Sequence, residues 1–490
     1  MNRILTVCLI AFGFAFTNPT PSSAQQLDDS TKTERTDLLY NGIQLPDVWP
    51  PRKRDDSMTV GVVPLTGFFS TLFMMDVDMH QISARQVVSS TILQPRQARV
   101  LAGVACLLCV AGGISSGEIP QPVVNTARDR EAGVKTIVTV SQSTSELPRK
   151  SEGDVIELND GRLLLVSMEF GGDGSDFAAT RFVAHESSDG GHSWGRHRVI
   201  TETSKGDLNV YSPNLIRAKD GGILLLFMRQ HRPGLLTNHV WKSTDEGKTF
   251  SPYAEFVPKR GFALCNATVK RLASGRLLLP ANPPAPGKPA ETGPYAATML
   301  YSDDDGLTWQ VSDSRVELPM RGAMEPHVEQ TADGRVLMVM RNQLGKLHFS
   351  ESKDNGATWD PAYASPLTAP ESCPELTRIP GTSDLLMIWN NSYDPKFRSH
   401  FGKRSPLTAA VSKDHGKTWR HLRDIETDPK RAFSNPGCRF TRDGRAIINY
   451  WTCEYLPNWA MQDVIDLRVA VIGKSWFYDR PSNAEEKDEK

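Results

Sequence analysis

Glu325 and Arg341 are the two ionisable residues whose spacing points most directly to chemistry. They lie 16 residues apart, near the two ends of the segment MEPHVEQTADGRVLMVMRN. The Asp-Gly pair between them predicts a tight antiparallel hairpin, whose two ends lie side by side. The run 336–340 is apolar enough to be buried, and an arginine that ends such a run needs a partner. We therefore expect a carboxylate and a guanidinium at one mouth of the fold.

Two further arginines and an acidic loop have residue types that suit the same kind of site. Arg149 precedes the predicted hairpin RKSEGDVIELNDG, and Arg404 lies in KRSPLTAAVSKDHGKTW. Guanidinium groups stay charged and bind carboxylates through paired hydrogen bonds, although a solvated arginine is the alternative interpretation of both. Asp176, with Asp173 as its rival, lies in GGDGSDF, whose glycines predict an exposed, pliable loop. A turn-forming aspartate is the alternative there.

An internal repeat indicates which elements would position these residues. A strand–turn–strand pattern occurs six times, as VIELNDGRLLLV, LIRAKDGGILLLF, VKRLASGRLLLP, VEQTADGRVLMVM, LTRIPGTSDLLMIW and CRFTRDGRAIINY. The turn positions, 49 to 61 residues apart, are Gly161, Gly221, Gly275, Gly334, Ser383 and Gly444. This spacing predicts an all-β fold, a six-bladed propeller of four-stranded antiparallel blades. Residues 133–140 would close the ring by pairing with residues 464–472.

A second motif, SxDxGx(S/T)(W/F), recurs in phase with the first. Its aspartates are Asp189, Asp245, Asp304, Asp354 and Asp414. Asp and Ser side chains satisfy the backbone of such a turn, the glycine takes a left-handed conformation, and the aromatic ring anchors the turn between sheets. The motif resembles the Asp box, or BNR repeat, of the sialidase (neuraminidase) superfamily, and the resemblance covers about residues 133–478. Because the boxes are structural turns, they specify the fold and not the activity.

The resemblance implies an exo-sialidase type of glycoside hydrolase that acts on terminal sialic acid or a related anionic sugar. Arg149, Arg341 and Arg404 match the three arginines that hold the sugar carboxylate, although Arg-Lys-Ser replaces the family's Arg-Ile-Pro at the first. Asp176 matches the acid/base aspartate. Glu325 matches the glutamate that partners a nucleophilic tyrosine.

Asn435 is a departure from the family pattern, because it stands in AFSNPGCRFTRDG where the nucleophilic tyrosine is expected. An amide cannot act as that nucleophile. Four alternatives to this nucleophile remain. They are a tyrosine from elsewhere (Tyr393, Tyr450 or Tyr455), water attack aided by Glu325, a different substrate, or lost catalysis. The rival functions are a non-catalytic carbohydrate-binding propeller and a structural propeller that presents its loops to another protein.

The N-terminal region has the features of an exported protein. Residues 1–24 have the charged start, apolar run and small-residue site of a signal peptide. Residues 25–132 have no assigned fold and contain a second apolar segment, 100–114, which is too short for a stable membrane span. The propeller would occupy 133–478, and 479–490 would be a charged tail. We expect a secreted, periplasmic or cell-surface protein.

Composition excludes several classes of partner and cofactor. The 490 residues include 56 Lys+Arg and 57 Asp+Glu, a net charge of −1, which argues against a nucleic-acid binder. No phosphate-binding or dinucleotide fingerprint occurs, so no cofactor is predicted. Outside the apolar leaders the cysteines are Cys265, Cys373, Cys438 and Cys453. Since none has metal-ligand spacing, no metal site is predicted, and buried free thiols are favoured over one or two disulfides.

Overall fold

The computed structural model describes residues 135–479, apart from 256–260, 290–292, 398–399 and 463. The expected signal peptide (1–24), the segment 25–132 and residues 480–490 of the expected tail lie outside the described residues. Within the described ranges the chain forms strands β1 to β25 and one 3₁₀ turn, η1 (Lys474–Phe477), and no α-helix. None of the described helical segments is long and apolar enough to cross a membrane.

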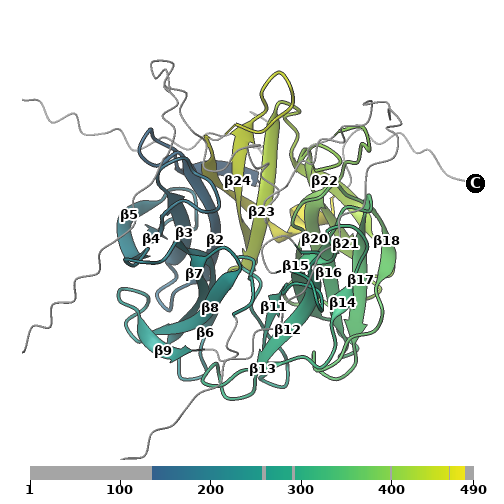
Figure 1. The fold of residues 1–490 in the computed structure, drawn as a ribbon, viewed down its shortest axis with the longest axis horizontal. Coiled ribbons are helices and arrows are strands. Elements are labelled where there is room, and N and C mark those ends of the chain that lie inside the picture. The colour runs from purple at the N-terminus through teal and green to yellow at the C-terminus, as the bar shows by residue number, and fades with distance from the viewer. Residues whose placement is uncertain (1–134, 256–260, 290–292, 398–399, 463, 480–490) are drawn as a thin grey trace, which may run out of the picture. The chain divides into compact units, whose positions relative to one another are not determined.

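The strands form six antiparallel sheets, which Figure 1 shows as the blades of a ring. The first blade contains β2 (Arg149–Glu157), β3 (Leu163–Phe170), β4 (Thr180–Ser187) and β5 (Gly195–Glu202). The second contains β6 (Asn209–Arg217), β7 (Ile223–Arg232), β8 (Leu235–Ser243) and β9 (Ser251–Glu255). The third contains β10 (Lys270–Arg271), β11 (Leu277–Ala281), β12 (Ala296–Ser302) and β13 (Gln310–Val311), with a short extra strand, β14 (Val316–Glu317), paired to β12.

The remaining blades follow the same order. The fourth contains β15 (Met324–Gln330), β16 (Val336–Arg341), β17 (Lys346–Ser352) and β18 (Tyr363–Thr368). The fifth contains β19 (Glu375–Arg378), β20 (Leu385–Asn390), β21 (Leu407–Ser412) and β22 (Arg420–Glu426). The sixth contains β23 (Arg431–Phe440), β24 (Arg445–Glu454), β25 (Asp466–Gly473) and β1 (Lys135–Ser141). The predicted six-bladed propeller is confirmed.

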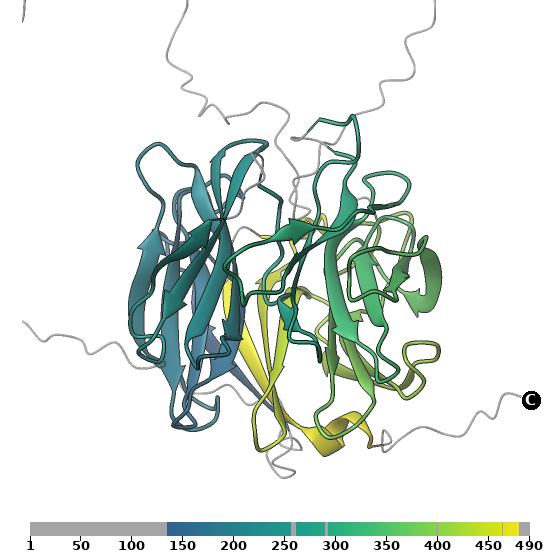
Figure 2. The same cartoon turned by 90° about the horizontal axis from the view of Figure 1, so that it is seen from below.

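The last blade closes the ring by combining the two ends of the propeller. Strand β1 pairs with β25, and Lys135 lies opposite Ile472, as the sequence predicted for residues 133–140 and 464–472. The 3₁₀ turn η1 follows directly and is the short yellow helical turn at one end of the propeller in Figure 2. The pairing of β1 with β25 therefore joins the two ends of the propeller.

Burial along the blades explains why apolar runs dominate the inner strands. Every residue of β3 is buried, whereas the outermost strand of that blade, β5, is largely exposed. Neighbouring blades pack face to face, as where the rings of Phe182 and Phe227 meet edge-on at 5.4 Å. Burying such side chains contributes roughly 1.5–3 kcal/mol each. The core is therefore a set of layers between blades.

The two kinds of sequence motif lie at one end of the propeller. The turn between β2 and β3 contains Gly161, whose φ of 86° is the left-handed conformation that the hairpin requires. The first Asp box follows β4 at the same end, because Ser187 pairs with Leu163. Arg149 pairs with Phe170 at the other end of that sheet. The first strand of each blade begins at the end of the propeller opposite the Asp boxes. We call this end the mouth end.

The Asp boxes share one hydrogen-bond pattern. In the first, Asp189 Oδ1 accepts hydrogen bonds from the Ser187 hydroxyl at 2.8 Å and from the backbone N–H of Ser193 at 2.9 Å. The indole N–H of Trp194 donates to the carbonyl of Gly191 at 3.0 Å. The two contacts of the aspartate recur around Asp245, Asp304, Asp354 and Asp414. The contact of the indole with the glycine carbonyl recurs at Trp309 and Trp419.

Candidate functional site

Bulges in the first strands place polar side chains at the mouth end. The register of β2, β6, β15 and β23 shifts once in each strand. Each shift contains one residue with a left-handed backbone: Glu152, Ser212, Glu325 and Asn435, with φ of 32°, 57°, 41° and 50°. A bulge changes the direction of a side chain relative to the regular pleat. Residues other than glycine rarely adopt positive φ, and such backbones cluster at functional sites.

Arg149 is the centre of the first group of charged residues. Its Nη1 lies 2.7 Å from Asp176 Oδ1, and its Nη2 lies 2.9 Å from Glu152 Oε1. The same Nη2 donates to the Tyr211 hydroxyl at 3.1 Å, and that hydroxyl donates to Asp176 Oδ1 at 2.9 Å. The guanidinium also lies 4.0 Å above the ring of Phe170. A buried arginine, two carboxylates and a phenol thus form one connected network.

Burial and charge act in opposite directions on this group. Burial lowers the pKa of Arg149, but Glu152, Tyr211 and Asp176 outweigh it and raise that pKa above its usual value. Burial raises the pKa of Glu152, although Arg149 opposes the shift. Burial also raises the pKa of Tyr211 well above its usual value, and Arg149 again opposes it. The arginine stays charged and the phenol stays neutral at ordinary pH.

Arg341 is the centre of the second group. Its Nη1 lies 2.8 Å from Glu325 Oε2, and its Nη2 lies 3.3 Å from Glu371 Oε1. Glu371 also forms an ion pair with Arg321, and its Oε2 accepts a hydrogen bond from Gln343 at 3.0 Å. Burial would raise the pKa of Glu371, but Arg341 and Arg321 outweigh it and lower that pKa. Glu371 is therefore a buried, ionised carboxylate held in a receptor of arginines and an amide.

Arg404 joins this second group through the backbone of Glu371. Its Nη2 donates to the Glu371 carbonyl and its Nη1 to the Ser434 hydroxyl, both at 3.1 Å. Its backbone N–H donates to the Tyr455 hydroxyl at 2.7 Å. Burial lowers the pKa of Arg404, and the positive charge of Arg341 lowers it further. Arg341 and Arg404 therefore both contact Glu371, one through its carboxylate and the other through its backbone carbonyl.

The structure brings the predicted site residues together in two sets. Glu325, Arg341 and Arg404 form one, and Arg149 with Asp176 forms the other. Within the described part of the chain, Arg149 and Arg341 share no hydrogen-bond partner. The alternative of solvated arginines is wrong for Arg149 and Arg404, whose exposed fractions are both 1%.

The predicted exposure of the acidic loop is correct for Asp173 but wrong for Asp176. Asp173 and Gly172 are exposed, whereas Asp176 is turned inward and is 5% exposed. The reason is the guanidinium of Arg149, which lies 27 residues away in sequence and pairs with the Asp176 carboxylate. Loop composition does not reveal a partner at that distance.

Asn435 and the alternative tyrosines occupy distinct places. The Oδ1 of Asn435 accepts a hydrogen bond from Trp451 Nε1 at 2.9 Å, and Asn435 is buried. Tyr450 of the sixth blade donates to Glu426 of the fifth, and Tyr393 is 40% exposed. Tyr455 contacts the backbone of Arg404 and not the carboxylates of the site. None of these contacts identifies a nucleophile.

Several residues of the two groups were missed by sequence reasoning, chiefly Tyr211, Glu371 and Cys373. One signal could have found part of them. Counting back nine residues from each turn glycine reaches equivalent positions of the first strands: Glu152, Ser212, Asn266, Glu325 and Asn435. Counting ten back from Ser383, in the fifth repeat, reaches Cys373. Tyr211 adjoins this set, but Glu371 has no such signal.

Two cysteines lie beside Glu325 of the second group, although the spacing of the cysteines in the sequence predicted no metal site. Cys265, Glu325 and Cys373 are buried, and their ligand atoms all lie within 4.8 Å of one another. Cys265 and Cys373 are free thiols. Ligands from three separate repeats cannot be recognised from sequence spacing. This is the set of described residues that could hold a metal ion.

Comparisons with known proteins agree with the fold. Residues 161–448 match the BNR repeat-like domain, which confirms the predicted Asp-box superfamily. No curated protein matches the chain. A protein of unknown function from Dyadobacter fermentans is 19% identical, with a TM-score of 0.53 over 69% of this chain and 98% of its own. A mutant NanB sialidase from Streptococcus pneumoniae is 13% identical, with a TM-score of 0.53 over 70% of this chain and 72% of its own.

A third similar solved structure is a complex with a ligand. Trypanosoma rangeli sialidase in complex with 2,3-difluorosialic acid, a covalent intermediate, is 15% identical, with a TM-score of 0.51. The match covers 69% of this chain and 59% of that one. At these identities the likeness to the three structures establishes the propeller fold and not a shared activity.

Proposed function

Because this chain belongs to the family of BNR repeat-like domain proteins, we propose that it is an exported glycoside hydrolase of the sialidase type. Its substrate would be a terminal sialic acid or a related anionic sugar of glycoconjugates, met outside the cell, in the periplasm or at the cell surface. The observation that carries this proposal is the receptor around Glu371. Arg341, Arg321 and Gln343 together bind a carboxylate, with Arg404 alongside.

The receptor matches the chemistry of a carboxylated sugar. Guanidinium groups bind carboxylates bidentately and keep their charge at any ordinary pH. In the absence of sugar the Glu371 carboxylate occupies the receptor, so a sugar carboxylate would have to compete with it. This competition explains how arginines that are almost fully buried can still serve a ligand.

The first group would supply the reacting residues. Asp176 Oδ1 accepts hydrogen bonds from both Arg149 and Tyr211, which suits a carboxylate that acts as a base. A nucleophile needs such a base within hydrogen-bond reach. We therefore assign Tyr211 as the leading nucleophile and Asp176 as its acid/base. As the Tyr211 oxygen bonds to the anomeric carbon and the bond to the aglycone oxygen breaks, the phenol proton would pass to Asp176 and from it to the departing oxygen. Glu325 would be the base for a water molecule if Tyr211 is not used.

Hydrolysis of a fluorogenic sialoside tests the proposal. The wild type should release the fluorophore, and Tyr211→Phe and Asp176→Asn should abolish release while leaving sugar affinity within about threefold. Arg341→Ala should instead weaken binding roughly 10- to 100-fold, because charged hydrogen bonds contribute about 1.5–3 kcal/mol each. Lys353→Ala, at an exposed ion pair with Asp360 on the fourth blade, is the control and should change neither. A wild type that neither binds nor cleaves sialosides would refute the proposal.

A non-catalytic carbohydrate-binding propeller is the second candidate, and Asn435 favours it. The residue that stands where the family resemblance places the nucleophile is an amide bonded to Trp451. In that case the wild type binds the sugar in titration calorimetry without cleaving it, and Tyr211→Phe has no effect on binding. Asn435→Tyr should then create turnover, provided that the variant remains folded.

A further inference from the structure

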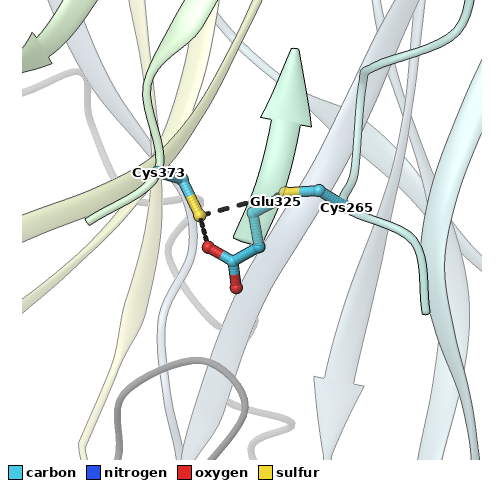
Figure 3. Close-up of side chains that lie close together, drawn as sticks. All are labelled: Cys265, Glu325 and Cys373. Atoms are coloured by element: carbon cyan, nitrogen blue, oxygen red, sulfur yellow. Dashed lines mark hydrogen bonds between the residues drawn. The ribbon is translucent and has the colours of Figure 1, made fainter. Parts of the chain in front are cut away.

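Three side chains from three consecutive blades converge at the mouth end, as Figure 3 shows for Cys265, Glu325 and Cys373. Cys265 precedes β10 of the third blade, Glu325 lies on β15 of the fourth, and Cys373 precedes β19 of the fifth. The two sulfur atoms are 3.9 Å apart, and Cys373 Sγ is within hydrogen-bond reach of Glu325 Oε2. The proposed hydrolysis uses neither cysteine.

The spacing of these atoms agrees with the coordination geometry of one metal ion. Two thiolates bound to a tetrahedral zinc at about 2.3 Å each are separated by roughly 3.8 Å, close to the sulfur–sulfur distance in this site. Sulfur ligands select zinc over calcium or magnesium, which prefer oxygen. A carboxylate completes three protein ligands, the number that leaves a fourth position for water or another ligand.

A hydrogen-bonded partner and a backbone bulge fix the orientation of the Glu325 carboxylate, as a metal ligand requires. Its Oε2 lies 2.8 Å from Arg341 Nη1, and hydrogen-bonded partners of this kind orient a ligating carboxylate. The bulge at Glu325, with its φ of 41°, sets the direction of the side chain. Pro326 and Pro374 follow Glu325 and Cys373 directly, which stiffens both backbones.

We propose that Cys265, Glu325 and Cys373 form a zinc site at the mouth of the propeller. Binding would replace the protons of the two thiols, so one Zn²⁺ enters as two protons leave. The resulting charge of the ion and its three ligands is −1, and the adjacent Arg341 guanidinium balances it. The ion would link the third, fourth and fifth blades beside the carboxylate receptor.

Zinc content measures this proposal independently of any glycosidase activity. The full chain, purified in the presence of a reductant, is incubated with zinc chloride, dialysed and analysed by atomic emission. We expect about one zinc per chain in the wild type and in Cys438→Ala, whose thiol is buried in the sixth blade. Cys265→Ala and Cys373→Ala should each lose most of it. Zinc should also raise the melting temperature of the wild type and Cys438→Ala only.

Cobalt substitution of the wild type keeps the proposal testable even if the variants fold poorly. Cobalt bound by two thiolates gives a near-ultraviolet charge-transfer band, and its absence from the wild type would overturn the proposal. The proposal would also be overturned if the zinc content of the wild type were no greater than that of the Cys265→Ala, Cys373→Ala double variant. The other contrary outcome is a disulfide: without reductant, denatured wild type and double variant would then contain equal numbers of titratable thiols.

Discussion

Arg341 Nη2 lies 3.3 Å from Glu371 Oε1, so an arginine predicted to bind a substrate carboxylate already binds a carboxylate of the protein. Arg321 pairs with the same carboxylate, and Arg404 contacts the Glu371 carbonyl. All these groups are buried or nearly so. The interaction stabilises the buried arginines, and under the proposed function it occupies the place that an anionic sugar would take.

Glu371→Gln should increase affinity for an anionic sugar, because the competing negative charge is removed while the shape of the side chain is kept. We expect sialic acid to bind roughly tenfold more tightly, equivalent to about 1.4 kcal/mol, as measured by titration calorimetry. The same variant should unfold more easily by roughly 3 kcal/mol, because Arg341 and Arg321 lose a charged partner. Unchanged or weaker sugar affinity would mean that the receptor does not serve the ligand.

The matched control for this prediction is Glu426→Gln. Glu426, the last residue of β22 in the fifth blade, is a buried carboxylate paired at 2.8 Å with Arg468 of the sixth blade. Its loss should also lower stability but should leave sugar affinity unchanged. Comparison of the two variants separates an effect on the receptor from a general effect of removing a buried ion pair.

Asn435→Ala should destabilise the protein by roughly 2 kcal/mol, because it leaves the buried indole N–H of Trp451 without its 2.9 Å acceptor. The left-handed φ of 50° adds to the loss, since asparagine tolerates this conformation better than alanine. Asn435→Asp keeps the hydrogen-bond acceptor and also tolerates the left-handed backbone, so it should lose less stability. Urea unfolding of the two variants measures the difference, and equal losses would contradict this account.

The fold could be predicted because its signals are local. Gly161 and its equivalents mark hairpins within a few residues, and the Asp189 box is complete within eight. The pairing of Glu325 with Arg341 was also within reach, because the hairpin register brings the two ends of one short segment together.

The rest of the candidate site could not be predicted because its contacts join different blades, or a strand and a loop far apart in the sequence. Cys265 and Cys373 meet across 108 residues, and Glu371, which lies outside the strands, meets Arg341 across 30. Asp176 is buried only because Arg149 neutralises it, and the composition of its loop indicates exposure. Such contacts depend on how the blades and their loops are arranged in space, which a repeat specifies only in outline.

Asp304→Ala tests whether the Asp boxes support the fold and not the site. Asp304 Oδ1 accepts hydrogen bonds from the Ser302 hydroxyl and the Thr308 backbone N–H, both at 2.8 Å. We expect a loss of about 1–2 kcal/mol in urea unfolding and no change in sugar affinity, since the box lies opposite the mouth end. Asp303→Ala is the control, because its exposed pair with Arg276 contributes less than about 1 kcal/mol. A change in sugar affinity caused by Asp304→Ala would refute the separation of the two ends.

His185 should make the stability of the first blade depend on pH. Burial, with the nearby charge of His197, lowers the pKa of His185 to about 4. Between pH 6.5 and about 4 the unfolded imidazole therefore binds a proton that the folded one does not, so the free energy of unfolding falls as pH falls through this window. The full effect is on the order of 3 kcal/mol. In urea unfolding at pH 7, 5.5 and 4.5, His185→Leu should lose this part of the pH dependence. His192→Leu should retain it. A His185→Leu profile parallel to that of the wild type would show that His185 is not the group responsible.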